Sequence, residues 1–212
     1  MPTQIYKLKD GTRVSGVTTV IGGNLGWSSR ALMHWAWNEG KEGRDYKATS
    51  KEACDAGTIA HAMIEADLKE IKYIPPEIAK EILDKADTAY LAWLEWKTLV
   101  NFELLGSEMP LVSEVYGFGG TIDAAIIQNK TAILDLKTSG ATYPDHLVQI
   151  AAYGKLYEEC YNKPVEAYYL LRLGKEDGSF HYSYWPELND AWTVFLNCLT
   201  LHKLQKTLKK KV

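Results

Sequence analysis

A change in hydrophobic periodicity near Gly106 constrains the fold of this chain more than any other feature. Before Gly106, apolar residues recur at helical spacing, and helices are expected at residues 29–37, 50–71 and 77–100. After Gly106, short β-rich runs predict strands at residues 108–116, 119–128, 131–138, 165–173 and 180–185, with helices at 145–161 and after Pro186. This order predicts an α/β (α+β) fold with a helical N-terminal cap.

The length and uniform composition of the chain favour one domain. No internal repeat or low-complexity linker interrupts its 212 residues, and a single core can serve a chain of about 250 residues. We expect residues 1–212 to form one unit: a helical part at 1–105, a sheet and helix at 106–185, and a terminal helix with a basic tail at 186–212.

Composition places the chain among ordinary globular proteins. It is 46% hydrophobic and 24% charged, with a net charge of -3, and contains no apolar run long enough for a membrane span. Its first residues have no hydrophobic stretch typical of a secretory signal. These features predict a cytoplasmic protein with no membrane partner.

Charge is distributed unevenly. Five lysines and no acidic residue lie between Leu201 and Val212, which leaves 19 basic against 27 acidic residues in the rest of the chain. An acidic body is atypical of a passive nucleic-acid binder, but it suits a protein that gathers carboxylates around a metal ion. Lys209 and Lys210 are candidate phosphate contacts; the alternative is a solvated helix end.

Two of the expected strands bring three charged residues together. If the turn is centred on Asn129, a hairpin would place Asp123 opposite Asp135, about 5 Å apart. Asp135 and Lys137 would share one face, because alternate residues of a strand point to the same side. Facing carboxylates destabilise a sheet unless a cation lies between them, so the pattern predicts a divalent metal site. The alternative is two solvent-facing acids.

Two helical segments carry further polar residues at regular spacing. Gln149 and Tyr153 lie one turn apart on one helix face, and His61 and Glu65 have the same spacing upstream. Gly57 falls inside that upstream helix, where glycine costs about 1 kcal/mol relative to alanine, so a close backbone approach is expected there. Glu108 and Glu114, beside the first of the central strands, are weaker candidate site residues.

Taken together in this order, the motifs resemble those of the PD-(D/E)XK nuclease superfamily. They are Gly-Thr-x-x-His at 57–61, Gly-x-x-Asp at 120–123, Asp-x-Lys at 135–137 and Gln-x-x-x-Tyr at 149–153. Within the superfamily the pattern is similar to the RecB-like branch. Val17–Val20 and Ala31–Ala36 resemble the N-terminal segment of phage and mitochondrial single-strand exonucleases. The resemblance implies a restriction-endonuclease-like core, with a central mixed sheet flanked by helices. It also implies a metal-dependent DNA nuclease, expected to act on DNA ends in phage or bacterial replication, recombination or repair.

The resemblance also implies roles for individual residues. Mg²⁺ or Mn²⁺ would be held by His61, Asp123, Asp135 and the carbonyl of Leu136, while Glu65 would bind a second metal, orient His61 or merely face solvent. Lys137 would orient the attacking water, with Gln149 and Tyr153 positioning it or contacting DNA. The candidate nucleic-acid contacts are Thr58, Trp35, Thr138, Ser139, Lys209 and Lys210, and Trp27 and Trp37 are candidates for stacking on unpaired bases.

Other activities receive less support from the residues. Three cysteines at unsuitable spacing do not predict the iron–sulfur cluster of some branch members, and there is no phosphate-binding loop of a helicase. A structure-specific endonuclease remains an alternative, as does a non-catalytic nucleic-acid-binding member of a recombination complex. The expected partner is DNA, single-stranded or with free ends, together with recombination or replication proteins.

Overall fold

The computed structural model describes residues 4–211, so residues 1–3 and 212 of the expected domain lie outside the described part. Its strands are β1 (Tyr6–Lys7), β2 (Arg13–Gly16), β3 (Glu103–Ser113), β4 (Phe118–Gln128), β5 (Lys130–Lys137), β6 (Ala167–Leu173) and β7 (Phe180–Trp185). Its helices are α1 (Val17–Asn24), α2 (Ser29–Lys41), α3 (Tyr46–Leu68), α4 (Lys80–Leu99), α5 (Pro144–Tyr161) and α6 (Asn189–Lys209). Among these described helices, none is long and apolar enough to cross a membrane.

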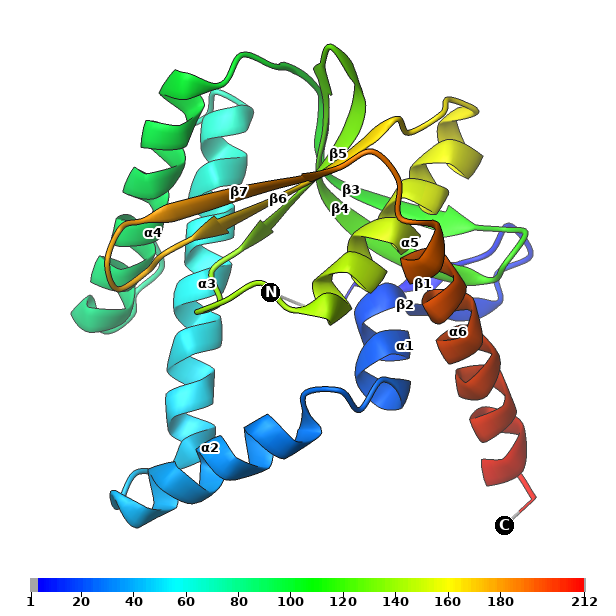
Figure 1. The fold of residues 1–212 in the computed structure, drawn as a ribbon, viewed down its shortest axis with the longest axis horizontal. Coiled ribbons are helices and arrows are strands. Elements are labelled where there is room, and N and C mark those ends of the chain that lie inside the picture. Colours follow the sequence, from blue (N-terminus) through cyan, green and yellow to red (C-terminus); the bar gives the residue numbers. More distant parts are fainter. Residues whose placement is uncertain (1–3, 212) are drawn as a thin grey trace.

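One mixed sheet joins all the described strands (Figure 1). Strand β4 pairs antiparallel with β3 along one of its edges. Along its other edge, the start of β4 pairs in parallel with β2, and its second half pairs antiparallel with β5. Strand β6 runs parallel to β5, and β7 antiparallel to β6. The predicted α/β fold with a central mixed sheet flanked by helices is therefore confirmed.

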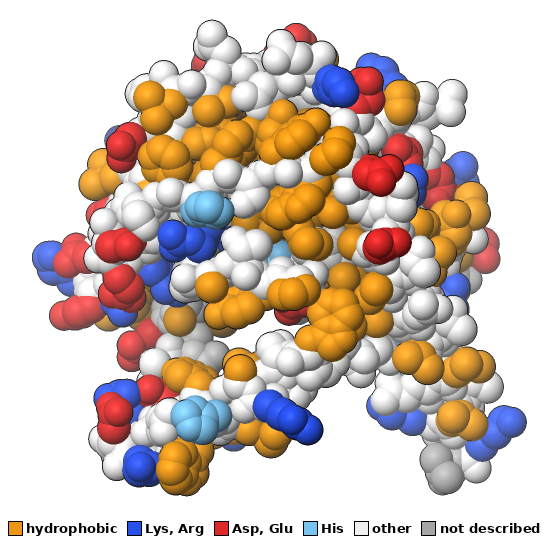
Figure 2. All heavy atoms as spheres, viewed as in Figure 1, with side chains coloured by type: hydrophobic (Ala, Val, Ile, Leu, Met, Phe, Trp, Pro, Cys, Tyr) orange, Lys and Arg blue, Asp and Glu red, His pale blue; other side chains and the backbone are white. Residues whose placement is uncertain are grey.

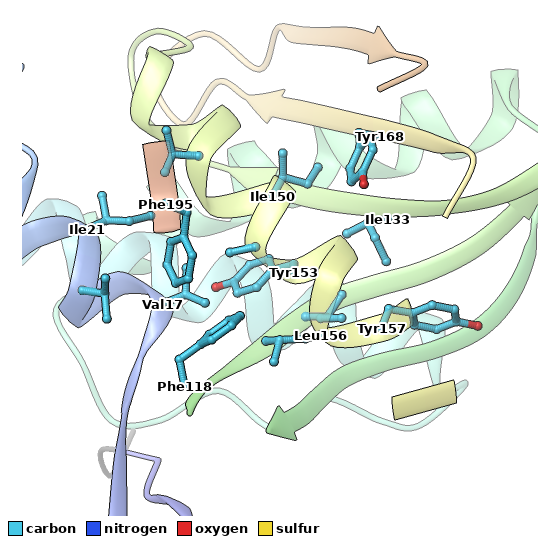
Figure 3. Close-up of a cluster of buried hydrophobic side chains, with 14 of the residues drawn as sticks. Val17, Ile21, Phe118, Ile133, Ile150, Tyr153, Leu156, Tyr157, Tyr168 and Phe195 are labelled. Carbon is cyan, nitrogen blue, oxygen red and sulfur yellow. The ribbon is translucent and has the colours of Figure 1, made fainter. Parts of the chain in front are cut away.

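Helices cover both faces of the sheet. On one face α1, α5 and α6 enclose a buried cluster to which β5 contributes Ile133 (Figure 3). On the other face α3 and α4 pack against a second cluster that includes Leu134, the next residue of the same strand. Because consecutive strand residues point to opposite faces, a strand buried on both sides is apolar at most positions. Residues 131–134 of β5 follow this pattern. The charged residues Asp135 and Lys137, which come next on the same strand, depart from it.

Helix α2 forms an arm that extends from the rest of the molecule (Figure 1). The side chains of Met33 and Trp37 are 65% and 59% exposed. Near the base of the arm, Arg44 pairs with Glu39 at 2.6 Å, and the Thr49 hydroxyl donates to the same Glu39 carboxylate. These polar contacts anchor α2 to the start of α3.

Element boundaries are where the sequence predictions were least accurate. The strand expected at 108–116 runs from Glu103 to Ser113, because the residues before Gly106 already pair with the end of β4. The helix expected from residue 50 already begins at Tyr46, because Asp45 caps α3 by accepting the Lys47 backbone N–H. The helix expected directly after Pro76 begins at Lys80. The segment from β1 to α1 was not predicted as regular structure, because two-residue and four-residue strands carry almost no periodic signal.

Candidate active site

Strands β4 and β5 pair in the predicted register and then separate. Their pairs run from Gln128–Lys130 to Ala124–Leu134, which confirms a turn centred on Asn129, a residue with φ of 65°. The pairing ends one position before Asp123 and Asp135 would face each other. Instead, the Leu136 backbone N–H donates to Asp123 Oδ2 at 2.8 Å. The expected direct pairing of Asp123 with Asp135 is therefore not made. We call the point where β4 and β5 stop pairing, between the carboxylates of Asp123 and Asp135, the fork.

Three side chains from different elements converge at this fork. His61 of α3, Glu108 of β3 and Asp123 of β4 each offer a ligand atom, and these atoms lie within 4.8 Å of one another. His61 Nδ1 is 3.7 Å from Asp123 Oδ1. An imidazole nitrogen with two carboxylates is a donor set that Mn²⁺ accepts readily and that Mg²⁺ can also use. The structure therefore joins two predicted ligands, His61 and Asp123, to the weaker candidate Glu108.

Glu108 adopts a backbone conformation that is rare for its residue type. Its φ is 47°, in the left-handed region, although it lies inside strand β3. The neighbouring pairs Ser107–Ala124 and Met109–Ile122 place it opposite Asp123. Such a conformation costs about 1–3 kcal/mol and is concentrated at functional sites. Burial, followed by the Asp123 charge, raises the pKa of Glu108 to about 7. Only the register of β3 against β4 reveals that Glu108 belongs with His61 and Asp123.

Asp135 is buried without a well-oriented hydrogen bond. Its side chain is 0% exposed, and Lys137 Nζ lies 2.5 Å from its Oδ2, in an ion pair whose angles do not satisfy hydrogen-bond geometry. Burial raises the pKa of Asp135 to about 6, even though the Lys137 charge opposes this effect. The shared strand face predicted for Asp135 and Lys137 is confirmed. A carboxylate this poorly compensated favours further positive charge beside it.

In the ion pair between His61 and Asp123, attractive charges outweigh the effect of burial on the pKa values, whereas burial dominates at Asp135. Burial lowers the pKa of His61, but the Asp123 carboxylate outweighs it and the net pKa is raised. Burial likewise raises the pKa of Asp123, but His61, Lys137 and the Leu136 N–H together hold that pKa below its ordinary value. The charged form of Asp123 is therefore favoured next to a fork that opens to solvent.

The pKa values of the site make stability depend on pH. In the absence of divalent cations, we expect the free energy of unfolding to decrease between about pH 4 and about pH 7, at about 1.4 kcal/mol per unit of pKa difference. Folding raises the pKa of Asp135 from 3.8 to about 6 and that of Glu108 from 4.5 to about 7, so the folded state holds more protons in this range. Urea unfolding across this range measures the slope. Asp135→Asn should flatten it, and stability that rises with pH would contradict the assignment.

An open cleft of about 590 Å³ lies beside the fork. Its lining includes the predicted residues Thr58, His61, Asp123, Leu136, Lys137, Thr138, Ser139 and Gln149. Gln149 Nε2 donates to the Tyr153 hydroxyl at 2.8 Å, so the predicted helix pair is connected to the cleft through its first member. Burial, followed by the charges of Asp135 and Asp123, raises the pKa of Tyr153 well above its ordinary range, so its hydroxyl stays protonated.

Several predicted residues lie outside the cleft lining. Glu65 pairs with Lys69 and is not part of the three-residue group, although its charge raises the pKa of Glu108. Glu114 accepts the Lys9 backbone N–H at 2.8 Å and is likewise outside the group. Lys209 and Lys210 lie at the end of α6, which contributes no residue to the cleft lining.

The aromatic residues of the arm form a separate feature. Trp27 and Trp37 are 56% and 59% exposed. Trp35 lines a second pocket, between α2 and the start of α5, together with Tyr143. The loop from Ser139 to Tyr143 separates this pocket from the cleft.

Gly57 is explained by its contact with the end of β5. A Cβ atom at Gly57 would lie 2.6 Å from Thr138 Oγ1. This confirms the close approach predicted for a glycine inside a helix. It also fixes how near α3, which carries His61, lies to the strand that carries Lys137.

Gly57→Ala is expected to destabilise the protein despite the higher helix propensity of alanine. Overpacking against Thr138 should lower the free energy of unfolding by about 1–3 kcal/mol. Chemical denaturation of the single variant and of Gly57→Ala with Thr138→Ala measures the effect, because the second change removes the Oγ1 atom. A stabilised single variant would show that the contact is not restrictive.

Sequence reasoning missed several residues of the cleft, among them Ser50, Cys54 and Lys175. Cys54 precedes Gly57 by one helical turn on α3, and Lys175 lies in the turn after β6. No local sequence pattern distinguishes a lysine that lines a cleft from a solvated lysine in a surface turn. Only the packing of the turn against α3 reveals Lys175 as a cleft residue.

Comparisons with known proteins give a weak structural similarity. No family model matches the chain, and no curated protein matches it at a significant level. The chain is similar to the crystal structure of an alkaline exonuclease (LHK-Exo) from Laribacter hongkongensis, at 12% identity, and to that of LHK-Exo in complex with dAMP, at 13%. Each match covers 74% of this chain and 93% of the other, with a TM-score of 0.37. Because both TM-scores are below 0.5, we base the function of this chain on its own residues.

Proposed function

We propose that this protein is a metal-dependent deoxyribonuclease that hydrolyses phosphodiester bonds from DNA ends. The observation that carries the proposal is the convergence of His61, Glu108 and Asp123 beside a lysine held by a buried carboxylate. Of these residues, His61, Asp123 and the lysine line an open cleft. Hydrolysis of a phosphodiester requires a positioned water and neutralisation of the charge that develops on phosphate oxygens. The cleft offers groups for both tasks.

The residues of the fork fit a divalent cation, Mg²⁺ or Mn²⁺. His61, Glu108 and Asp123 would hold it, with Asp135 and the carbonyl of Leu136 as further proposed ligands. The buried Asp135 carboxylate, which lacks a well-oriented hydrogen bond, supports this fit. A bound divalent cation polarises phosphate oxygens and lowers the pKa of water. Glu65, one helical turn after His61, is proposed to orient His61 or to bind a second metal.

Lys137 is the proposed catalytic residue that orients the attacking water. Its ammonium group is anchored to Asp135 and lines the cleft beside Asp123. From this position it can hold a water by hydrogen bonding and stabilise negative charge on the phosphate. Gln149 lines the same cleft and, held by Tyr153, is a proposed contact to the DNA backbone. Thr58, Thr138 and Ser139 would supply hydroxyl contacts.

Preference for DNA ends is supported by the arm. In Figure 2 α2 stands away from the body of the molecule, with hydrophobic side chains on both sides of an open recess. The pocket in this region is lined by Trp35 and Tyr143, and aromatic side chains can stack on unpaired bases at about 1–3 kcal/mol per base. Trp27 and Trp37 are further proposed stacking residues. A strand passing beneath the arm toward Lys137 would need a free end to enter.

The proposed enzyme uses the whole chain as one nuclease domain. Helix α3 of the N-terminal part supplies His61, and the central strands supply the other proposed ligands. The basic end of α6, with Lys209 and Lys210, is a proposed secondary DNA contact. We propose that such an enzyme acts in the cytoplasm of a bacterium or phage-infected host, in replication, recombination or repair, with partner proteins of those processes.

Digestion of end-labelled DNA tests this function. Linear single-stranded DNA labelled at the 5′ or 3′ end, and a circular single strand, are incubated with the protein in Mg²⁺, in Mn²⁺ and with a chelator. We expect linear DNA to be degraded, circular DNA to survive, and the chelator to stop degradation. Cleavage of the circle would establish the endonuclease alternative. Binding without cleavage in either metal would establish the non-catalytic alternative.

A further inference from the structure

Lys175 supplies positive charge to the cleft without a carboxylate partner. It lies in the turn after β6 and lines the same cleft as Lys137 and Asp123. Its Nζ donates to the backbone carbonyl oxygen of Ala53 at 3.1 Å. Among the described residues, no carboxylate oxygen lies within 4.0 Å of this Nζ, and the adjacent Glu176 pairs with Lys85 instead. The ammonium group is therefore positioned by a neutral acceptor, and its charge remains available.

The sheet places Lys175 at one end of the cleft and Lys137 near the fork. Strands β5 and β6 run parallel, and Lys137 pairs with Arg172, three residues before Lys175. The backbones at the two lysines are thus separated by one strand spacing and a short stretch of chain, on the order of 10 Å. This separation suits two different phosphates of one strand better than a single phosphate.

The cleft that contains the two lysines is rich in hydroxyl groups. Its lining includes Ser50, Thr58, Thr138 and Ser139, and the one acidic side chain in the described lining is Asp123 of the proposed metal group. Hydroxyl groups and lysines are common contacts of a DNA backbone, whereas carboxylates would repel it. Burial lowers the pKa of Lys175; the Glu176 charge opposes this effect and the Lys85 charge adds to it. A hydrogen-bonded phosphate would favour the charged form of Lys175.

We infer that Lys175 binds a backbone phosphate that neighbours the scissile one and so sets how firmly the DNA strand is seated in the cleft. This inference rests on the proposed nuclease function and assigns the side of the cleft along which the strand continues beyond the site of cleavage. A contact of this kind acts on binding in the ground state and in the transition state alike. Its loss should therefore raise KM and leave kcat nearly unchanged.

Lys175→Ala tests the contact by cleavage of linear single-stranded DNA. We expect KM to rise roughly tenfold, because a hydrogen bond to a charged group is lost, and the dependence of log KM on log salt to weaken by about one phosphate contact. Lys175→Arg should restore both values. Lys163→Ala removes an exposed lysine outside the cleft and should match the unaltered protein.

Lys175→Gln separates phosphate binding from a structural role. Glutamine can still donate a hydrogen bond to the Ala53 carbonyl, but it has no charge. If Lys175 binds phosphate, Lys175→Gln should resemble Lys175→Ala in KM and in salt dependence. If it only fastens the turn to α3, glutamine should restore KM, which would overturn the inference.

Alkylation of Cys54 gives a readout that does not depend on cleavage. Cys54 is exposed and lines the cleft with Lys175, whereas Cys160 is exposed outside it and Cys198 is buried. An excess of linear oligonucleotide, in Ca²⁺, should slow labelling of Cys54 by a maleimide and leave Cys160 unchanged. In Lys175→Ala, this protection should require roughly tenfold more DNA.

These two experiments distinguish failure of the inference from failure of the proposed function. Protection of Cys54 that depends on Lys175, in a protein that never cleaves DNA, would refute the nuclease and retain the phosphate contact. Active cleavage with an unchanged KM and salt dependence in Lys175→Ala would refute the contact and retain the nuclease. Cys54 that stays fully reactive at saturating DNA would also overturn the inference.

Discussion

Lys137→Ala is expected to lower the rate of DNA cleavage by about 10³-fold or more. Lys137 Nζ is held 2.5 Å from the buried Asp135 carboxylate and lines the cleft beside the proposed metal group. Loss of one such positioned donor typically costs about 10²–10³ in kcat, and loss of its charge adds to that cost. Single-turnover digestion of 5′- and 3′-labelled linear DNA in Mg²⁺ and in Mn²⁺ measures the effect.

Removal of Lys137 also leaves Asp135 buried without its ion pair. The thermal unfolding of the variant must therefore be recorded alongside its activity. Lys137→Arg keeps the charge but changes the shape of the donor, so it should fold normally and still cleave poorly. Lys163→Ala controls for the general loss of one lysine. A folded Lys137→Ala protein that cleaves at the normal rate would remove Lys137 from the proposed mechanism.

Asp123→Asn is expected to weaken cation binding strongly and to abolish cleavage. Asp123 contacts His61, accepts the Leu136 N–H and lies in the group of candidate ligands. Asparagine keeps nearly the same shape but removes a carboxylate charge, so the affinity for Mn²⁺ should fall by about 10²-fold or more. Titration calorimetry with Mn²⁺ alone measures this loss without any nuclease assay.

Glu114→Gln provides the matched control for Asp123→Asn. Glu114 is also an acid near the central strands, but it lies outside the ligand group and bonds to the Lys9 backbone instead. Its replacement should leave Mn²⁺ affinity and cleavage unchanged. If Asp123→Asn binds Mn²⁺ as well as the unaltered protein does, the fork is not the metal site.

The hairpin of β4 and β5 was predictable because its signals are local. The turn centred on Asn129 fixes the register, and the alternation along β5 fixes which side Asp135 and Lys137 share. Helix α5 was equally accessible, since its predicted start at residue 145 differs by one residue from the observed Pro144. Helix starts governed by capping were less predictable, because Asp45 and Thr49 both have suitable side chains and only packing chooses between them.

Local signals were enough to predict an α/β fold and to single out Asp123, Asp135 and Lys137, because turns, periodicity and spacing act over a few residues. The mixed sheet and the role of His61 were expected from the motif resemblance. Which of these side chains meet depends on tertiary packing. The fork between β4 and β5, the left-handed backbone of Glu108 and the position of Lys175 depend on how β3, α3 and the turn after β6 pack. These contacts join residues from 13 to 122 positions apart, and no local pattern encodes an approach over such distances.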